Sequence, residues 1–110
     1  MVEGQEGPSW DDWLALAEAC EQHGLEALFR SDHYLSLTDP GRVATDAWTL
    51  IGALAARTSK LRLGTLVSPV TFRHPAVVSK AAATADQVSG GSIEGGMGAG
   101  WEEREQERFG

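Results

Sequence analysis

Basic residues are scarce in this sequence, and their scarcity argues against two classes of partner. Only 9 of the 110 residues are lysine or arginine, whereas 16 are aspartate or glutamate, so the formal net charge at pH 7 is −7. Proteins that bind nucleic acids normally present a basic patch to the phosphates. Anionic membrane surfaces likewise attract basic segments. We therefore expect neither a nucleic acid nor a membrane surface among the partners of this protein.

Long apolar runs and cysteine pairs are also missing. No apolar stretch approaches the roughly 18 residues that a membrane span needs, and the acidic start of the chain does not have the form of a signal peptide. Cys20 is the single cysteine, so an internal disulfide is impossible. Together these absences predict a protein of the cytoplasm, where thiols stay reduced.

The spacings of three common site motifs are absent as well. The histidines, His23, His33 and His74, are not spaced as zinc ligands. No serine lies in the G-x-S-x-G elbow of many hydrolases. Six glycines lie between Gly90 and Gly100, but they do not complete the G-x-G-x-x-G dinucleotide pattern, and they follow a late strand. We expect no metal and no Rossmann-type nucleotide site.

What the sequence does contain is an alternation of amphipathic helices and short apolar strands. Ser9 and Asp12 have the spacing of a helix capping box, and Gly24 lies where a helix-ending glycine is expected. Asp46 and Pro75 are suited to begin two further helices. The predicted helices cover residues 9–23, 46–58, 75–89 and 101–108, and the predicted strands cover residues 25–29, 61–70 and a segment from about 93.

Two of these predicted elements carry more detailed expectations. In the first helix, Trp10, Trp13 and Cys20 recur at helical spacing, which favours packing in the core. In the strand at residues 61–70, Gly64 is expected to interrupt the strand and Pro69 to stop it.

The spacing of the strands predicts the fold class. Consecutive strands start roughly thirty residues apart with a helix between them, which indicates parallel strands joined by right-handed crossovers. This α/β pattern fits either a doubly wound open sheet or a (β/α)8 barrel. A barrel needs about 250 residues, so 110 residues would form less than half of one.

Unusual residues follow three of the predicted strands. Ser31, Asp32 and His33 follow one strand, residues 65–68 end the next, and residues 96–101 end the last. Because the carboxyl ends of parallel strands meet at one edge, we expect a ligand crevice there with an acid/base pair at its rim. The residues alone leave a second interpretation open, in which Asp32 is a turn or helix-cap carboxylate and His33 a hydrogen-bonded loop imidazole.

Three segments give the sequence a family resemblance. "LFRSDHY", "LRLGTLVSPVTFRHPAVVSKAAATADQVSGG" and "GMGAGW", in this order and spacing, resemble the luciferase-like flavin and deazaflavin oxidoreductases over residues 10–110. The resemblance implies an N-terminal portion of a (β/α)8 TIM barrel, about strands one to four, truncated at both ends, with residues 1–110 as one incomplete domain. "EGQEG" would then follow the end of the first strand.

The same resemblance implies a cofactor and roles for individual residues. Coenzyme F420, a deazaflavin that carries hydride, would lie across the strand ends and exchange hydride with a small-molecule substrate. Asp32 would bond the deazaflavin ring, and His33 would donate or accept the proton beside the reactive carbon, so both are implied catalytic residues. A non-prolyl cis peptide is implied at or next to Leu66–Val67. The implied cofactor contacts are Asp32, Thr65, Leu66, Val67, Gly98, Ala99 and Gly100.

Two departures and two alternatives accompany the resemblance. Gly95 stands where the family usually has a bulky apolar residue, and Ser92 stands where a basic residue is frequent. An FMN-dependent monooxygenase of the same superfamily is the alternative enzyme. The alternative of another class is a non-catalytic half-barrel that self-associates through its exposed strand edges. At full length, the resemblance implies a homodimer.

Overall fold

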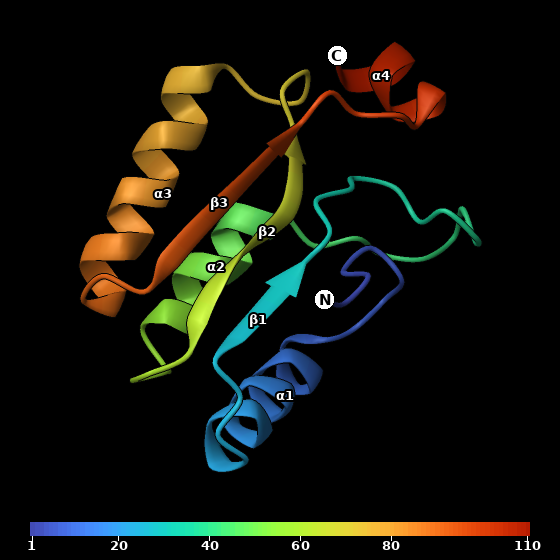
Figure 1. Cartoon of the computed structure of the whole chain (residues 1–110). Helices are drawn as coiled ribbons and strands as arrows, with labels where there is room; N and C mark the ends of the chain where they lie inside the picture. Colours follow the sequence, from blue (N-terminus) through green and yellow to red (C-terminus); the bar gives the residue numbers. More distant parts are fainter.

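The strands lie side by side in the order in which they occur in the chain. The structure, a computed structural model, describes all residues 1–110. It contains β1 (Ala27–Arg30), β2 (Arg62–Pro69) and β3 (Ile93–Gly98), which form one parallel sheet in the order β1-β2-β3 (Figure 1). Val2 adds a parallel bridge to Arg30, so the chain before the first helix lies on the outer edge of β1. This confirms the predicted parallel arrangement and places the N-terminal residues where a preceding strand would run.

Helices connect the strands and pack beside one another along the sheet. α1 (Trp10–Gln22) contacts β1, α2 (Ala47–Ala55) contacts β2, and α3 (Pro75–Ser89) contacts β3 (Figure 1). α2 in turn contacts both α1 and α3. A short fourth helix, α4 (Glu103–Phe109), follows β3. None of the helices has the length and apolarity that crossing a membrane would require.

The helix ends follow the predicted capping chemistry. Ser9 and Asp12 form the reciprocal capping box of α1, and Asp46 accepts a hydrogen bond from the backbone N–H of Thr49 at the start of α2. Gly90 ends α3 in the left-handed conformation, with a φ of 76° that favours glycine. α2 stops at Ala55, three residues before the predicted end.

The core lies between the sheet and the helices, and one predicted member is outside it. Trp13 and Cys20 are buried as expected, but Trp10 is 38% exposed. The prediction for Trp10 was wrong because it occupies the first turn of α1, before the buried face that begins at Trp13. The core cluster consists of Trp13, Ala17, Cys20, Leu28, Trp48, Leu50, Ile51, Leu54, Ala55, Leu61, Leu63, Val78 and Ala85.

β2 is continuous, so the expected interruption at Gly64 was also wrong. The strand runs without a break from Arg62 to Pro69. Gly64 is required for another reason: a Cβ atom there would overlap the carbonyl oxygen of Glu94 on β3 and press on the Phe29 ring. The glycine therefore permits close approach of two strands instead of ending one of them.

Two glutamates bind loops at opposite ends of the strands. One carboxylate oxygen of Glu21, on α1, accepts hydrogen bonds from three successive backbone N–H groups before β2, those of residues 59–61. Glu6 accepts hydrogen bonds from the Ser36 hydroxyl and from the backbone N–H of Leu37. The Glu6 contacts order the segment that follows the strand end of β1.

A matched pair of glycine substitutions tests the role of Gly64. We expect Gly64→Ala to lower the free energy of unfolding by about 1–3 kcal/mol or more, because the added methyl group overpacks against Glu94. Gly52→Ala, inside α2 with no atom within 4 Å of the added Cβ, should raise it by roughly 0.5–1 kcal/mol. Denaturant unfolding measures both, and a Gly64→Ala protein as stable as Gly52→Ala would contradict the packing argument.

The loop held by Glu6 should loosen in acid. The side-chain hydrogen bonds from Ser36 and Thr38 lower the pKa of Glu6 from 4.5 to about 2. A lowered pKa means that the contact is fully present above pH 4.5 and is lost as the pH falls toward 2. Hydrogen exchange of the Leu37 amide should show its protection falling across this window. In Glu6→Gln the protection should no longer change there, and unchanged protection at pH 2 in the unsubstituted protein would refute the assignment.

Candidate functional site

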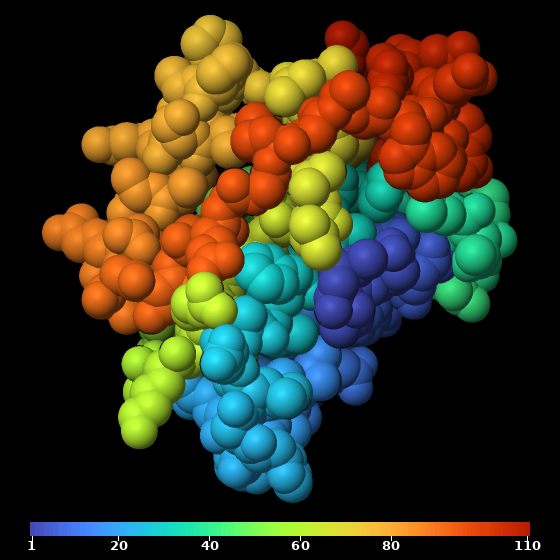
Figure 2. All heavy atoms as spheres, in the orientation of Figure 1, coloured from blue at the N-terminus to red at the C-terminus, as the bar shows by residue number.

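The three predicted strand ends meet around one cavity of about 420 Å³. His33 reaches it from the segment after β1, Leu66 and Val67 reach it from β2, and the backbone from Gly98 to Gly100 reaches it from the end of β3. On the face shown in Figure 2, the C-terminal residues in red and the N-terminal residues in blue approach this region from two sides. The expected gathering of the carboxyl ends is thus confirmed by the structure.

Six of the eight residues implied as site residues line this cavity, and two lie behind it. Asp32 and Thr65 are each only 1% exposed and contribute nothing to the cavity wall. The residues that do line it are His33, Leu66, Val67, Gly98, Ala99 and Gly100. Trp101, from the predicted crevice segment 96–101, also lines the cavity, and so does Glu105, which was not proposed from the sequence.

Leu66 and Val67 contribute apolar side chains to the cavity wall, one on each side of the Leu66–Val67 peptide bond. This bond is cis, as the family resemblance implied. The pairing between β2 and β3 shifts register at this point, between Thr65 and Ser68. Both side chains remain substantially exposed, at 51% for Leu66 and 38% for Val67. An apolar surface of this kind suits a flat, uncharged ring better than a hydrated ion.

Two glycines of β3, Gly96 and Gly98, are explained by the close approach of β2 at Thr65 and Val67. A Cβ atom at Gly98 would lie 2.6 Å from Val67 Cγ2, and one at Gly96 would lie 3.0 Å from Val67 Cγ1. Gly100 has a φ of 83°, which other residues rarely adopt. These glycines let the backbone of β3 pass close to the shifted part of β2, so they serve packing and also leave the cavity open.

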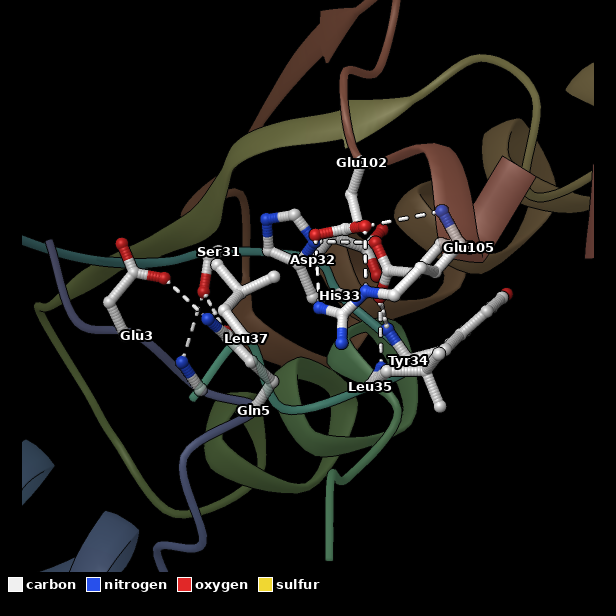
Figure 3. Close-up of polar contacts among 12 residues, drawn as sticks. Glu3, Gln5, Ser31, Asp32, His33, Tyr34, Leu35, Leu37, Glu102 and Glu105 are labelled. Carbon is white, nitrogen blue, oxygen red and sulfur yellow. Dashed lines mark hydrogen bonds and ion pairs between the residues drawn. The ribbon is translucent and has the colours of Figure 1, made fainter. Parts of the chain in front are cut away.

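His33 is held at the cavity by a buried carboxylate. Its Nδ1 atom lies 2.6 Å from Oε2 of Glu105, and the two residues are shown together in Figure 3. The imidazole ring also meets the Trp101 ring edge-on, with the centroids 5.8 Å apart. Because Nδ1 is occupied by Glu105, Nε2 is the ring nitrogen left for a ligand.

Glu105 was not predicted from the sequence, yet it contacts the predicted motif at three points. Its second oxygen, Oε1, accepts hydrogen bonds from the backbone N–H groups of Tyr34 at 2.6 Å and Leu35 at 2.9 Å. It is the one buried residue of α4, whereas Arg104 and Glu107 of the same helix are exposed. In the sequence it is one acid within a charged run, which gives no signal of burial.

Asp32 is the centre of a separate, buried network behind the cavity. Arg73 donates to both of its carboxylate oxygens, with Nη2–Oδ1 at 3.0 Å, and the Ser68 hydroxyl donates to Oδ2 at 2.7 Å. Arg73 also donates to Asp46, the residue that caps α2. The interpretation of Asp32 as a turn or helix-cap carboxylate was wrong, because its carboxylate is one half of an ion pair with Arg73. Its predicted contact with a cofactor stays a prediction.

The charges of this network stabilise one another. Burial would lower the pKa of Arg73, but the hydrogen bonds and charges of Asp32 and Asp46 outweigh it, so the pKa is raised and the guanidinium stays charged. Burial alone would raise the pKa of Asp46, but the Thr49 N–H and Arg73 lower it overall. The Arg73 guanidinium also lies over the Tyr34 ring, 4.9 Å from its centroid.

Comparison with known proteins identifies relatives over nearly the whole chain. The luciferase-like monooxygenase family matches residues 1–110. F420-dependent glucose-6-phosphate dehydrogenase of Nakamurella multipartita is 39% identical over 97 residues, which are 87% of this chain and 28% of that protein. The enzyme of the same name from Amycolatopsis mediterranei is 37% identical over 90 residues, 81% of this chain and 27% of that one. The chain thus spans less than a third of the length of the curated relatives it matches.

Solved structures share the arrangement of the strands and helices. Monooxygenase RslO1 of Streptomyces bottropensis superposes with a TM-score of 0.80 at 29% identity, covering 91% of this chain and 30% of that one. The coenzyme F420-dependent tetrahydromethanopterin reductase of Methanopyrus kandleri gives 0.77 at 24% identity, covering 98% and 28%. The oxygenating constituent of 3,6-diketocamphane monooxygenase of Pseudomonas putida, in complex with FMN, gives 0.82 at 18% identity, covering 100% and 32%.

The consecutive parallel strands, the cavity at their carboxyl ends and these matches agree on one assignment. This chain belongs to the luciferase-like monooxygenase family, and it forms the N-terminal portion of a (β/α)8 barrel.

Proposed function

We propose that this chain is the N-terminal part of an F420-dependent oxidoreductase that transfers hydride between a small organic substrate and the deazaflavin. The observation that carries the proposal is the cavity in which His33 faces the apolar Leu66–Val67 wall and the glycine-rich end of β3. The curated relatives described above, which are named as F420-dependent dehydrogenases, support the choice of cofactor. Coenzyme F420, when bound, supplies the carbon that accepts or releases the hydride.

The cavity wall fits a flat deazaflavin ring. Leu66 and Val67 expose apolar surface on one side, and a planar aromatic system would remove that surface from water. From Gly98 to Gly100 the backbone lines the cavity with a single small side chain, that of Ala99, so a ring could approach the main chain closely. Leu66, Val67, Gly98, Ala99 and Gly100 are therefore the residues that we propose contact the cofactor.

His33 is the residue proposed to handle the proton. Histidine is the side chain that most often acts as general acid or base in enzymes. Nε2 is the proposed site of that exchange because Nδ1 is bound to Glu105. Trp101 flanks the ring and limits the positions that the imidazole can adopt.

Asp32 and Thr65 have indirect roles in this proposal. Both oxygens of Asp32 are engaged by Arg73 and Ser68, so Asp32 anchors the segment that carries His33. The Thr65 hydroxyl lies 3.2 Å from the Gly96 carbonyl oxygen and 3.0 Å from the Ser68 hydroxyl, whose single proton is donated to Asp32. The direct contacts of Asp32 and Thr65 with the ring, implied by the family resemblance, stay predictions that need a turn of either side chain toward the cavity.

The setting of the enzyme is also part of the proposal. The single, buried Cys20 is compatible with the reducing cytoplasm. Val77 and Val88 of α3 are both about half exposed beside a groove between α2 and α3, and burying this surface would favour a homodimer. A monooxygenase is a second candidate, because RslO1, a monooxygenase, is 29% identical to this chain. FMN is the cofactor that the family resemblance implies for that candidate.

Binding titrations distinguish these candidates. We expect the full-length enzyme that contains this chain to bind coenzyme F420 at least tenfold more tightly than FMN, as measured by quenching of deazaflavin and flavin fluorescence. Tighter binding of FMN would replace the proposal with the monooxygenase candidate. For the 110-residue chain by itself, binding of neither cofactor together with self-association in sedimentation would favour the non-catalytic half-barrel.

Substitution of His33 separates proton transfer from cofactor binding. In the full-length enzyme, His33→Ala should reduce kcat by roughly 10²–10⁴-fold, the usual contribution of a positioned acid or base. The Kd for the cofactor should change much less, because Leu66, Val67 and the glycines remain. His23→Ala, at an exposed position after α1, is the matched control. A His33→Ala enzyme with unchanged kcat would remove His33 from the proposed mechanism.

A further inference from the structure

Glu105 is a buried carboxylate without a lysine or arginine to neutralise it. It is 0% exposed, and its one ionisable partner is His33. The acids next to it along α4, Glu103 and Glu107, are both exposed. Burying a carboxylate is costly unless hydrogen bonds replace the lost water. The three contacts of Glu105 with the segment after β1 provide that replacement.

The division of these contacts between the two oxygens determines where the His33 proton lies. Oε1 accepts from the Tyr34 and Leu35 N–H groups, which can only donate. Oε2 lies 2.6 Å from His33 Nδ1, and an ionised carboxylate can only accept. With Glu105 as a carboxylate, a hydrogen bond at this distance requires a proton on Nδ1. In the neutral ring, Nε2 is then left with a free lone pair on the cavity side.

We infer that Glu105 is a positioning residue that fixes His33 as the Nδ1–H tautomer and aims Nε2 at the cavity. The pair has the chemical logic of the carboxylate–histidine pair of serine proteases, in which a buried acid holds one ring nitrogen so that the other can exchange protons. The consequence for catalysis rests on the proposed function, since it concerns the same histidine. The tautomer itself does not depend on any cofactor.

The position of Glu105 on α4 links the orientation of His33 to the packing of that helix. Glu105 lies 72 residues after His33, on the helix that follows β3. The same carboxylate orients the imidazole and binds the two backbone N–H groups that come directly after it. The imidazole is therefore oriented in this way only when α4 is packed against the segment after β1. Formation of the site thus depends on completion of this part of the barrel.

The tautomer can be read by nuclear magnetic resonance without any ligand. Two-bond ¹H–¹⁵N correlation spectra of the ¹⁵N-labelled protein distinguish a protonated from a bare ring nitrogen, and a His33→Gln variant assigns the signals. In mildly alkaline buffer we expect a proton on His33 Nδ1 and none on Nε2. His74 is an internal reference of the opposite kind, because its Nδ1 accepts from the Ala76 N–H and must be bare. A bare Nδ1 on His33 would overturn the inference.

An isosteric substitution provides the decisive comparison. In Glu105→Gln, the amide oxygen must face the two backbone N–H groups, which leaves the NH₂ group facing His33 Nδ1. We expect the tautomer to invert to Nε2–H. Glu103→Gln, an exposed change in the same helix, should leave it as in the unsubstituted protein. An unchanged tautomer in a folded Glu105→Gln protein would overturn the assignment, and if that variant does not fold, the spectrum of the unsubstituted protein decides alone.

These results are separable from the fate of the proposed function. A protein that shows the Nδ1–H tautomer but does not bind coenzyme F420 would retain the positioning role of Glu105 and lose the cofactor assignment. A protein that binds the cofactor but has a bare Nδ1 on His33 would keep the proposed activity and lose the role of Glu105.

Discussion

The buried ion pair between Asp32 and Arg73 is the interaction on which the arrangement of the strand ends depends. Arg73 precedes α3, and it joins the end of β1 to the Asp46 cap of α2, so one guanidinium ties three loops together. Ser68 extends the network from Asp32 to the indole N–H of Trp48. A buried ion pair offsets its desolvation only when its remaining hydrogen-bonding groups are satisfied. Here both Asp32 oxygens and both terminal nitrogens of Arg73 have partners, so the pair fixes the site geometry.

Asp32 is engaged in this network, whereas the adjacent residue His33 lines the cavity. The two residues are adjacent in sequence, yet Asp32 joins the buried network behind the cavity wall, whereas His33 lies on the cavity side. Each is held by a partner distant in sequence, Arg73 in one case and Glu105 in the other. Asp32 and His33 are thus two separately supported groups. Asp32 holds the loops around the strand ends together, and His33 lines the cavity, where we propose that it exchanges the proton.

The sequence predicted the elements well because their signals are local, and it predicted the site less completely because its partners are not. The capping box at Ser9 and the Asp46 cap lie within a few residues of the helix starts that they define, and both were identified. Gly64 was misread as a strand interruption because its constraint is the Glu94 backbone on another strand. Glu105 and Arg73 were missed for the same reason, since no short-range pattern marks a charged residue as buried 41 or 72 residues from its partner.

The charges around the cavity also bear on how the proposed cofactor would lie. Besides His33, the titratable side chains that line the cavity are acids: Glu3, Glu102 and Glu105. A side-chain hydrogen bond from Arg104 lowers the pKa of Glu102, which keeps this rim residue ionised. A negative rim repels phosphate but tolerates an uncharged aromatic ring. Under the proposed function, the uncharged ring of a deazaflavin suits this cavity better than its phosphate-bearing chain does. We therefore expect the phosphates to bind away from Glu3 and Glu102.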